Sequence, residues 1–225
     1  MTEVPAFALL AGKARYLARG AASAIAKSPV PGPVKIGFLG LEGDEQADLR
    51  VHGGPDKALH HYPHDHYAFW REARAGEPLL AGLGAFGENI ATLGLLEDSV
   101  CIGDRFRLGS ALIEVSQGRQ PCWKQGERLH WPALPALMVR ERRSGWYYRV
   151  IEEGLAEPGD ALALLDRPLP AWTVRRVFGL LIAGDHRTDP AALTDLAGMA
   201  MLFAGWRARA AELRALMANS TAEPD

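Results

Sequence analysis

The chain has 225 residues, enough for one large domain or for one domain with a small appendage. Its 25 Lys and Arg residues are balanced by 27 Asp and Glu, and the net charge of −2 argues against a surface that binds nucleic acid or an anionic membrane as a whole. No apolar run approaches the roughly 20 residues of a membrane-spanning helix, and Lys and Arg interrupt the Ala-rich N-terminal part. We therefore expect no membrane anchor and no signal peptide, and two cysteines without a disulfide framework favour the reducing cytoplasm.

Short strands and turns are expected up to about Leu165, because Gly, Pro and short apolar runs punctuate this part of the chain. One helix is expected to interrupt it, beginning near Pro63 and covering residues 65–74, since Pro suits a first helical turn and apolar residues fall on one face. Residues 105–115 predict a tight hairpin. Gly109 and Ser110 join its two alternating segments, and glycine takes the positive φ that such a turn needs.

Residues 167–170, with the sequence RPLP, are typical of a linker, because Pro continues neither a strand ladder nor a helix interior. Three short amphipathic helices are expected beyond it: one with apolar spacing from Val174, one opened by Asp189 and Pro190, and one with a stripe from Phe203. Short helices must bury such stripes on each other or on the strands. We predict a strand-rich catalytic or binding domain at residues 1–166 and a three-helix domain at residues 171–225.

Cys122 is the residue that most directly suggests chemistry. A thiolate is a soft metal ligand and a nucleophile, and the nearby Arg119 and Lys124 would lower its pKa. The alternative is a buried cysteine that acts as a small hydrophobe, although Pro121 and the flanking cations argue against a buried strand position. Cys101 lies in an apolar run and is assigned to the core.

Four further motifs could contribute to a ligand site, and each also has an ordinary structural explanation. The glycine-rich residues 39–58 could bring backbone amides close to a ligand near His52, Gly53 and Gly54, or could form turns alone. Lys27 and Ser28 offer a cation and a hydroxyl, and Asn89 offers an amide after a glycine turn. The histidines at 60, 61, 64 and 66 lack an HExxH motif and are expected to be solvated or to cap a helix rather than to hold zinc.

Taken in order, seven runs resemble the MOSC domain, the module named for the C-terminal part of molybdenum-cofactor sulfurases. They resemble most the YiiM-like group of the 6-hydroxylaminopurine-resistance type, whose small three-helix domain also matches residues 172–216. The runs are SAIAK at 23–27, LEGDEQAD at 41–48, HGGPDKA at 52–58, FGEN at 86–89, GDRF at 103–106, VSQ at 115–117 with PC at 121–122, and SGWY at 144–147.

The resemblance implies a β-barrel, mainly β with α, that binds the molybdenum cofactor, with Cys122 as the ligand of molybdenum. It also implies that Lys27 and Ser28 contact the cofactor and that Asn89 lies in a comparable loop. The Arg that contacts the cofactor phosphate in mitochondrial relatives is absent before Asn89, so Arg119, His52 or Arg149 could replace it. Backbone amides of the glycine-rich turns, at Gly53 and Gly54, suit the same phosphate.

Related reductases reduce N-hydroxylated bases and amidoximes with electrons from partner proteins, and this activity is the leading hypothesis. The chain has no cysteine cluster for iron–sulfur and no GxGxxG motif, so a reductase would need an external electron donor. The alternative is a module that carries the cofactor or sulfur on Cys122 without turnover. A stress-related interaction protein would leave Cys122 and the basic residues 119–149 without a role.

Overall fold

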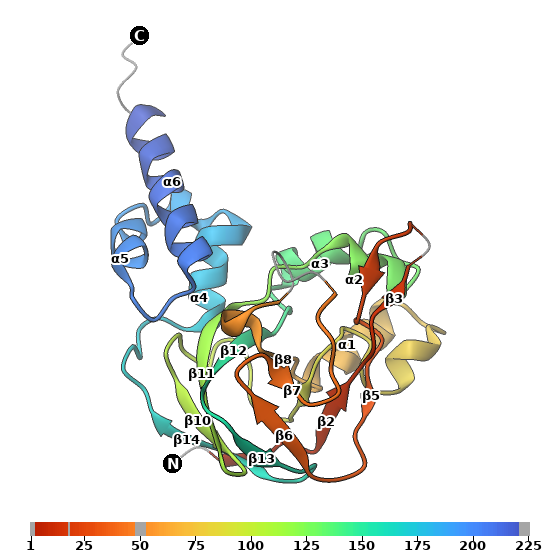
Figure 1. Cartoon of the computed structure of the whole chain (residues 1–225). Helices are drawn as coiled ribbons and strands as arrows, with labels where there is room; N and C mark the ends of the chain where they lie inside the picture. The colour runs from red at the N-terminus through yellow and green to blue at the C-terminus, as the bar shows by residue number, and fades with distance from the viewer. Residues whose placement is uncertain (1–2, 18, 48–52, 221–225) are drawn as a thin grey trace.

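The computed structural model describes residues 3–17, 19–47 and 53–220. Figure 1 shows a curled, strand-rich body followed by helices that stand on one end of it. The strands are β1 (Glu3–Pro5), β2 (Ala8–Ala11), β3 (Arg15–Tyr16), β4 (Ala22–Ser23), β5 (Ser28–Pro29), β6 (Val34–Gly37), β7 (Gly40–Leu41), β8 (Leu59–His61), β9 (Ile90–Ala91), β10 (Arg105–Leu108), β11 (Ala111–Gly118), β12 (Trp146–Glu152), β13 (Gly154–Ala156) and β14 (Ala161–Asp166). The α-helices are α1 (Asp65–Ala73), α2 (Trp123–Arg128), α3 (Leu134–Glu141), α4 (Val174–Phe178), α5 (Ala192–Gly198) and α6 (Ala204–Ser220).

Nine strands form one sheet in the order β1-β14-β10-β11-β12-β8-β9-β2-β5, with short strands at both edges. The sheet curls into half a barrel, which confirms the expected mainly β architecture (Figure 1). The predicted hairpin is also confirmed, since β10 pairs with β11 from Arg105 opposite Glu114 to Leu108 opposite Ala111. Gly109 in its turn has φ +56°, and a Cβ there would lie 2.1 Å from the Leu155 carbonyl oxygen, so this turn requires glycine.

The predicted helix near Pro63 is confirmed as α1, but the expectation of a single helix before residue 166 was wrong. Helices α2 and α3 follow β11. Leu129, just after α2, and Met138 of α3 pack with Trp70 of α1 in a second apolar cluster. Both are short, α2 contains Gly126, and α3 carries Pro135 in its first turn. Tertiary packing stabilises them where local propensity is weak.

The C-terminal helices bury the predicted apolar stripes on each other and on the sheet: α5 packs on α6, and α4 packs on β11. A Cβ on Gly118 of β11 would lie 3.0 Å from the Trp206 ring, so the first turn of α6 contacts this strand. The Phe203 amide donates to the Ser116 carbonyl at 2.9 Å, and Phe178 of α4 packs beside Trp206. One apolar cluster therefore runs from the sheet into the helices. No helix in the described ranges has the length and apolar character that crossing a bilayer requires.

Candidate functional site

Cys122 lies between the end of β11 and the first residue of α2. Its side chain is partly exposed, whereas Cys101 is 1% exposed, as the sequence predicted for a core cysteine. The Arg119 guanidinium lies 3.7 Å from the Cys122 sulfur through Nη2, and the Cys122 amide donates to Gln125 Oε1 at 3.4 Å. A cation at this distance favours the thiolate over the thiol.

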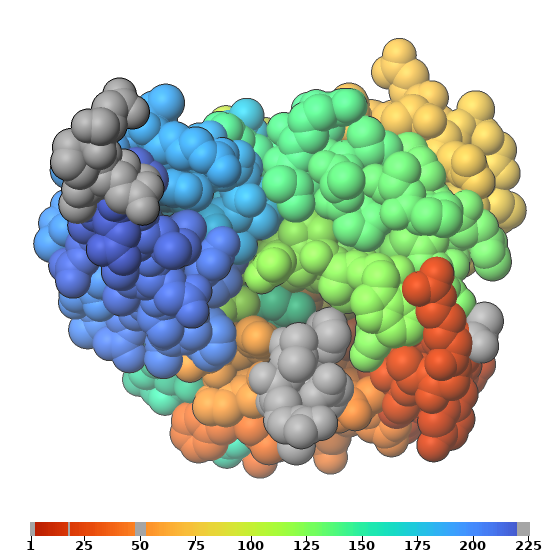
Figure 2. All heavy atoms as spheres, turned by 90° about the horizontal axis from the view of Figure 1, so that it is seen from above, coloured from red at the N-terminus to blue at the C-terminus, as the bar shows by residue number. Residues whose placement is uncertain are grey.

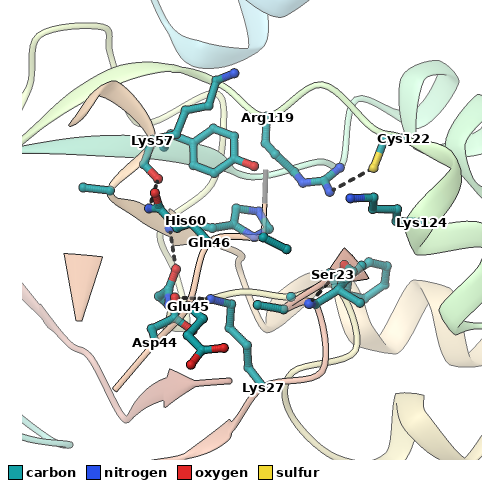
Figure 3. Close-up of a pocket in the computed structure, with 18 residues that line it drawn as sticks. Ser23, Lys27, Asp44, Glu45, Gln46, Lys57, His60, Arg119, Cys122 and Lys124 are labelled. Atoms are coloured by element: carbon teal, nitrogen blue, oxygen red, sulfur yellow. Dashed lines mark hydrogen bonds and ion pairs between the residues drawn. The ribbon is translucent and has the colours of Figure 1, made fainter. Parts of the chain in front are cut away.

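A cavity opens beside Cys122, and four of the predicted site residues line it: Lys27, Asn89, Arg119 and Cys122 itself. They come from three separate segments, because Arg119 and Cys122 share the loop between β11 and α2, and Figure 3 shows Lys27 across the cavity from Arg119 and Cys122. The cavity holds about 600 Å³ of space with its open mouth included.

Lys27 forms a buried ion pair with Asp44 on one wall of this cavity. The Lys27 and Asp44 side chains are 8% and 5% exposed. Asp44 also accepts hydrogen bonds from Asn89 Nδ2 and from the Gly12 amide, both at 2.8 Å. Burial lowers the pKa of Lys27, and the Asp44 and Glu88 carboxylates oppose that shift. Lys27 thus presents an ammonium group whose charge Asp44 already balances in part.

Arg119 and His60 supply unpaired polar atoms at the cavity. Arg119 is 4% exposed and donates through Nη1 to Gln125 Oε1 and to the Gln120 carbonyl, but its Nε has no partner in the described part of the chain. His60 Nε2 lacks a partner in the same way. Burial, together with the Arg119 and Lys27 cations, holds the pKa of His60 well below its ordinary value, so its ring is neutral. Figure 3 shows His60 between the Lys27–Asp44 pair and Arg119.

The expectation that the histidine run is solvated was wrong for three of its members. His60, His61 and His66 are at most 4% exposed. His61 Nε2 lies 2.9 Å from Thr92 Oγ1, and His66 Nε2 lies 2.7 Å from Glu97 Oε2. His60 and His61 belong to the packed interior because β8 lies between β12 and β9 inside the sheet, and His66 lies on the buried face of α1.

Other predicted site residues lie away from the cavity lining. Ser28 is exposed on β5, and the Gly54 amide donates to Gln46 Oε1 at 3.0 Å, next to Gly53. Arg149 is held by Asp56 and Glu114 at 2.6 and 2.7 Å, so it does not supply the cavity with a cation. His52 lies outside the described residues.

The MOSC domain matches residues 48–163, slightly more than half of the chain. The chain belongs to the MOSC-domain family. YiiM of Escherichia coli (strain K12) is 45% identical over 156 residues, which cover 69% of this chain and 70% of YiiM. The uncharacterized protein YflK of Bacillus subtilis (strain 168) is 40% identical over 82% of this chain and 81% of YflK.

A protein of Gibberella moniliformis (strain M3125 / FGSC 7600) named "Reductase" is 43% identical over 156 residues, but this MOSC chain spans only 28% of its length. Among solved structures, YiiM from Geobacillus stearothermophilus superposes with a TM-score of 0.79 at 34% identity, covering 94% of this chain and 99% of that one. YiiM from Escherichia coli superposes with a TM-score of 0.77 at 31% identity. These matches place the chain in the YiiM-like group of MOSC proteins.

The MOSC cavity also contains residues that the sequence did not single out. Asp44, Glu45 and Gln46 line it from one loop, and Lys57 and Tyr147 line it as well. Gln46 Nε2 donates to the Lys57 carbonyl at 3.4 Å. Burial raises the pKa of Tyr147 despite the nearby Arg119 cation, so its hydroxyl keeps its proton. Residues 44–46 lie inside the run LEGDEQAD, whose match to the family was the available signal.

Proposed function

We propose that this MOSC protein binds the molybdenum cofactor in the cavity beside Cys122 and reduces N-hydroxylated compounds, such as N-hydroxylated bases and amidoximes. One observation carries the proposal. A partly exposed thiol lies beside an arginine at the edge of a cavity whose other walls hold buried cations and unpaired nitrogen atoms. Cytoplasmic location and an external electron-donor protein remain part of this proposal.

The residues present fit the cofactor. Its dithiolene leaves the metal a soft protein position, which the Cys122 thiolate suits. Its pterin carries hydrogen-bonding edges, and the unpaired Arg119 Nε and His60 Nε2 are placed to meet such groups. Its phosphate needs cations, and Arg119, Lys124 and Lys57 line the same cavity.

The reaction takes R–NHOH, two electrons and two protons to R–NH2 and water, and the N–O bond is the one that breaks. The electrons come from the partner protein. When bound, the cofactor supplies the two-electron redox chemistry. Arg119 stabilises the thiolate charge of Cys122, and the Tyr147 hydroxyl remains a hydrogen-bond donor at neutral pH. The Lys27–Asp44–Asn89 cluster fixes the opposite wall.

The test is metal analysis with turnover, on protein made in a host that synthesises the molybdenum pterin. Wild-type protein is expected to contain molybdenum and to reduce an N-hydroxylated base with an artificial electron donor. Cys122→Ala should lose the metal or the activity. Cys101→Ala is the matched control, because Cys101 is a core residue away from the cavity. Equal metal and equal turnover in Cys122→Ala would remove Cys122 from this role, and metal without turnover in the wild type would favour the carrier.

A further inference from the structure

Two further clefts reach Cys122, one on each side of Trp123. The first, called the helix cleft here, lies between the strand-rich body and the C-terminal helices. Its walls include Tyr147 on one side and Phe203 and Trp206 on the other. Figure 2 shows a hollow between the blue C-terminal helices and the green segment that contains α2 and α3. If the cofactor fills the cavity, a substrate must approach Cys122 through one of these clefts.

The chemistry of the helix cleft suits a flat, neutral ring. Aromatic side chains stand on both walls, and Lys57 Nζ lies 4.8 Å from the centre of the Phe203 ring. Aromatic walls bind flat rings through stacking and edge contacts. Cations border both clefts: Lys57, Lys124 and Arg209, with Glu212, line the helix cleft, and Arg15, Arg19 and Arg128 line the second cleft. The helix cleft differs in having Tyr147 on one wall and Phe203 and Trp206 on the other.

Gln117 lines the helix cleft with a buried side-chain amide whose oxygen, Oε1, is unpaired among the described residues. The residue is 2% exposed. The β11–β12 register shifts between Val115 and Gln117, where a β-bulge breaks the regular pairing. Bulges of this kind re-aim side chains and occur often next to active sites. A buried amide oxygen without a partner is costly, so its presence beside a cleft points to a ligand.

We propose that Gln117 is a substrate-recognition residue, and that it pairs its amide with the donor and acceptor atoms on the edge of a nitrogen heterocycle held in the helix cleft. A carboxamide offers one acceptor and two donors, which match a ring nitrogen beside an N–H group. This inference rests on the proposed reductase function for its kinetic test, but binding of the ring to the cleft does not depend on turnover.

The experiment compares Gln117→Leu and Gln117→Met with wild type, all as cofactor-loaded full-length protein. Two substrates are used: 6-hydroxylaminopurine, which has ring nitrogens, and benzamidoxime, which has a flat ring without them. We expect KM for 6-hydroxylaminopurine to rise about tenfold or more, in line with the loss of a buried hydrogen bond, and KM for benzamidoxime to change less than about twofold. Gln120→Ala, which removes an exposed amide of the same cleft, is the matched control.

Two more measurements separate recognition from a structural role. The molybdenum content should be unchanged, and the melting temperature should stay the same or rise, because each variant removes a buried oxygen that lacks a partner. Titration of adenine against tryptophan fluorescence tests ring binding without turnover. Weaker adenine binding in the variants supports the role of Gln117 even if the wild type proves inactive. Unchanged adenine binding and unchanged KM in an active enzyme would refute it, as would a large fall in melting temperature in both variants.

Discussion

Asp44→Asn probes the buried ion pair on the cavity wall. The substitution keeps the shape of the side chain but removes the charge that faces Lys27, whose side chain is 8% exposed. Breaking a buried pair by removing one partner costs about 3–5 kcal/mol, and the lower end applies because the amide oxygen still accepts a hydrogen bond. In a chain of this size, about 3 kcal/mol corresponds to a melting temperature lower by roughly 6–12 °C.

Urea unfolding of the cofactor-free protein measures this cost. The matched control is Glu152→Gln, which breaks the exposed Arg107–Glu152 pair and should cost about 1 kcal/mol or less. The double variant Lys27→Met with Asp44→Asn should recover part of the loss, since no unpaired charge is left inside. A cost for Asp44→Asn equal to that of the control would show that the pair is not buried in solution.

The same pair predicts a pH dependence. Burial places the folded-state pKa of Lys27 below its ordinary value of 10.5. Between these two pKa values the unfolded chain binds more protons than the folded one, so the contribution of Lys27 to stability rises with pH across that window. Without the Asp44 charge the folded-state pKa falls further, and the window widens toward neutral pH. The free energy of unfolding is measured for both proteins between about pH 7 and 10. If it depends on pH in the same way for Asp44→Asn and wild type, the Asp44 charge does not control the pKa of Lys27.

Two other predictions follow from the packing. Gly109→Ala should destabilise the protein by more than Gly94→Ala. Both glycines have positive φ, but of the two only Gly109 has a carbonyl oxygen 2.1 Å from the added Cβ. Urea unfolding should show a loss of stability of about 1–3 kcal/mol for Gly94→Ala and a larger loss for Gly109→Ala. Truncation after Asp166 tests the proposed division into residues 1–166 and 171–225. Because one apolar cluster joins the sheet and the helices, we expect the fragment to bind an apolar dye and to aggregate. A monodisperse fragment with a sharp unfolding transition would show that the strand-rich part folds alone.

Local sequence signals predicted the elements whose stabilising interactions are themselves local. The Gly109 hairpin is of this kind. Helices α1 and α6 were predicted from the apolar periodicity within each helix, although the partners of those apolar faces lie elsewhere in the chain. Helices α2 and α3 were missed because the sheet and α1, distant in sequence, stabilise them. The histidines were misjudged for a related reason: a short strand such as β8 carries no sign of its central place in the sheet.

The candidate site shows the same division between local and distant contacts. Motif resemblance selected Lys27, Asn89, Arg119 and Cys122, and the fold brings all four to one cavity. The hydrogen-bond partners of these residues could not be predicted from spacing in the sequence. Asn89 reaches Asp44 across 45 residues of sequence, and other contacts of the cavity wall span still longer separations. The helix cleft beside Cys122 arises only when the C-terminal helices dock on the strand-rich body.

The two edge strands of the curled sheet, β1 and β5, are poorly suited to pair with a strand from another molecule. β1 has three residues and β5 has two, and both contain a proline, at Pro5 and Pro29. A proline cannot donate to a further strand, and such short edges offer few free backbone groups. An open half-barrel can therefore persist at the high concentrations of an expressing cell without recruiting strands from neighbouring copies. Replacing these prolines would add a backbone N–H donor to each edge strand and so favour pairing with a neighbouring copy.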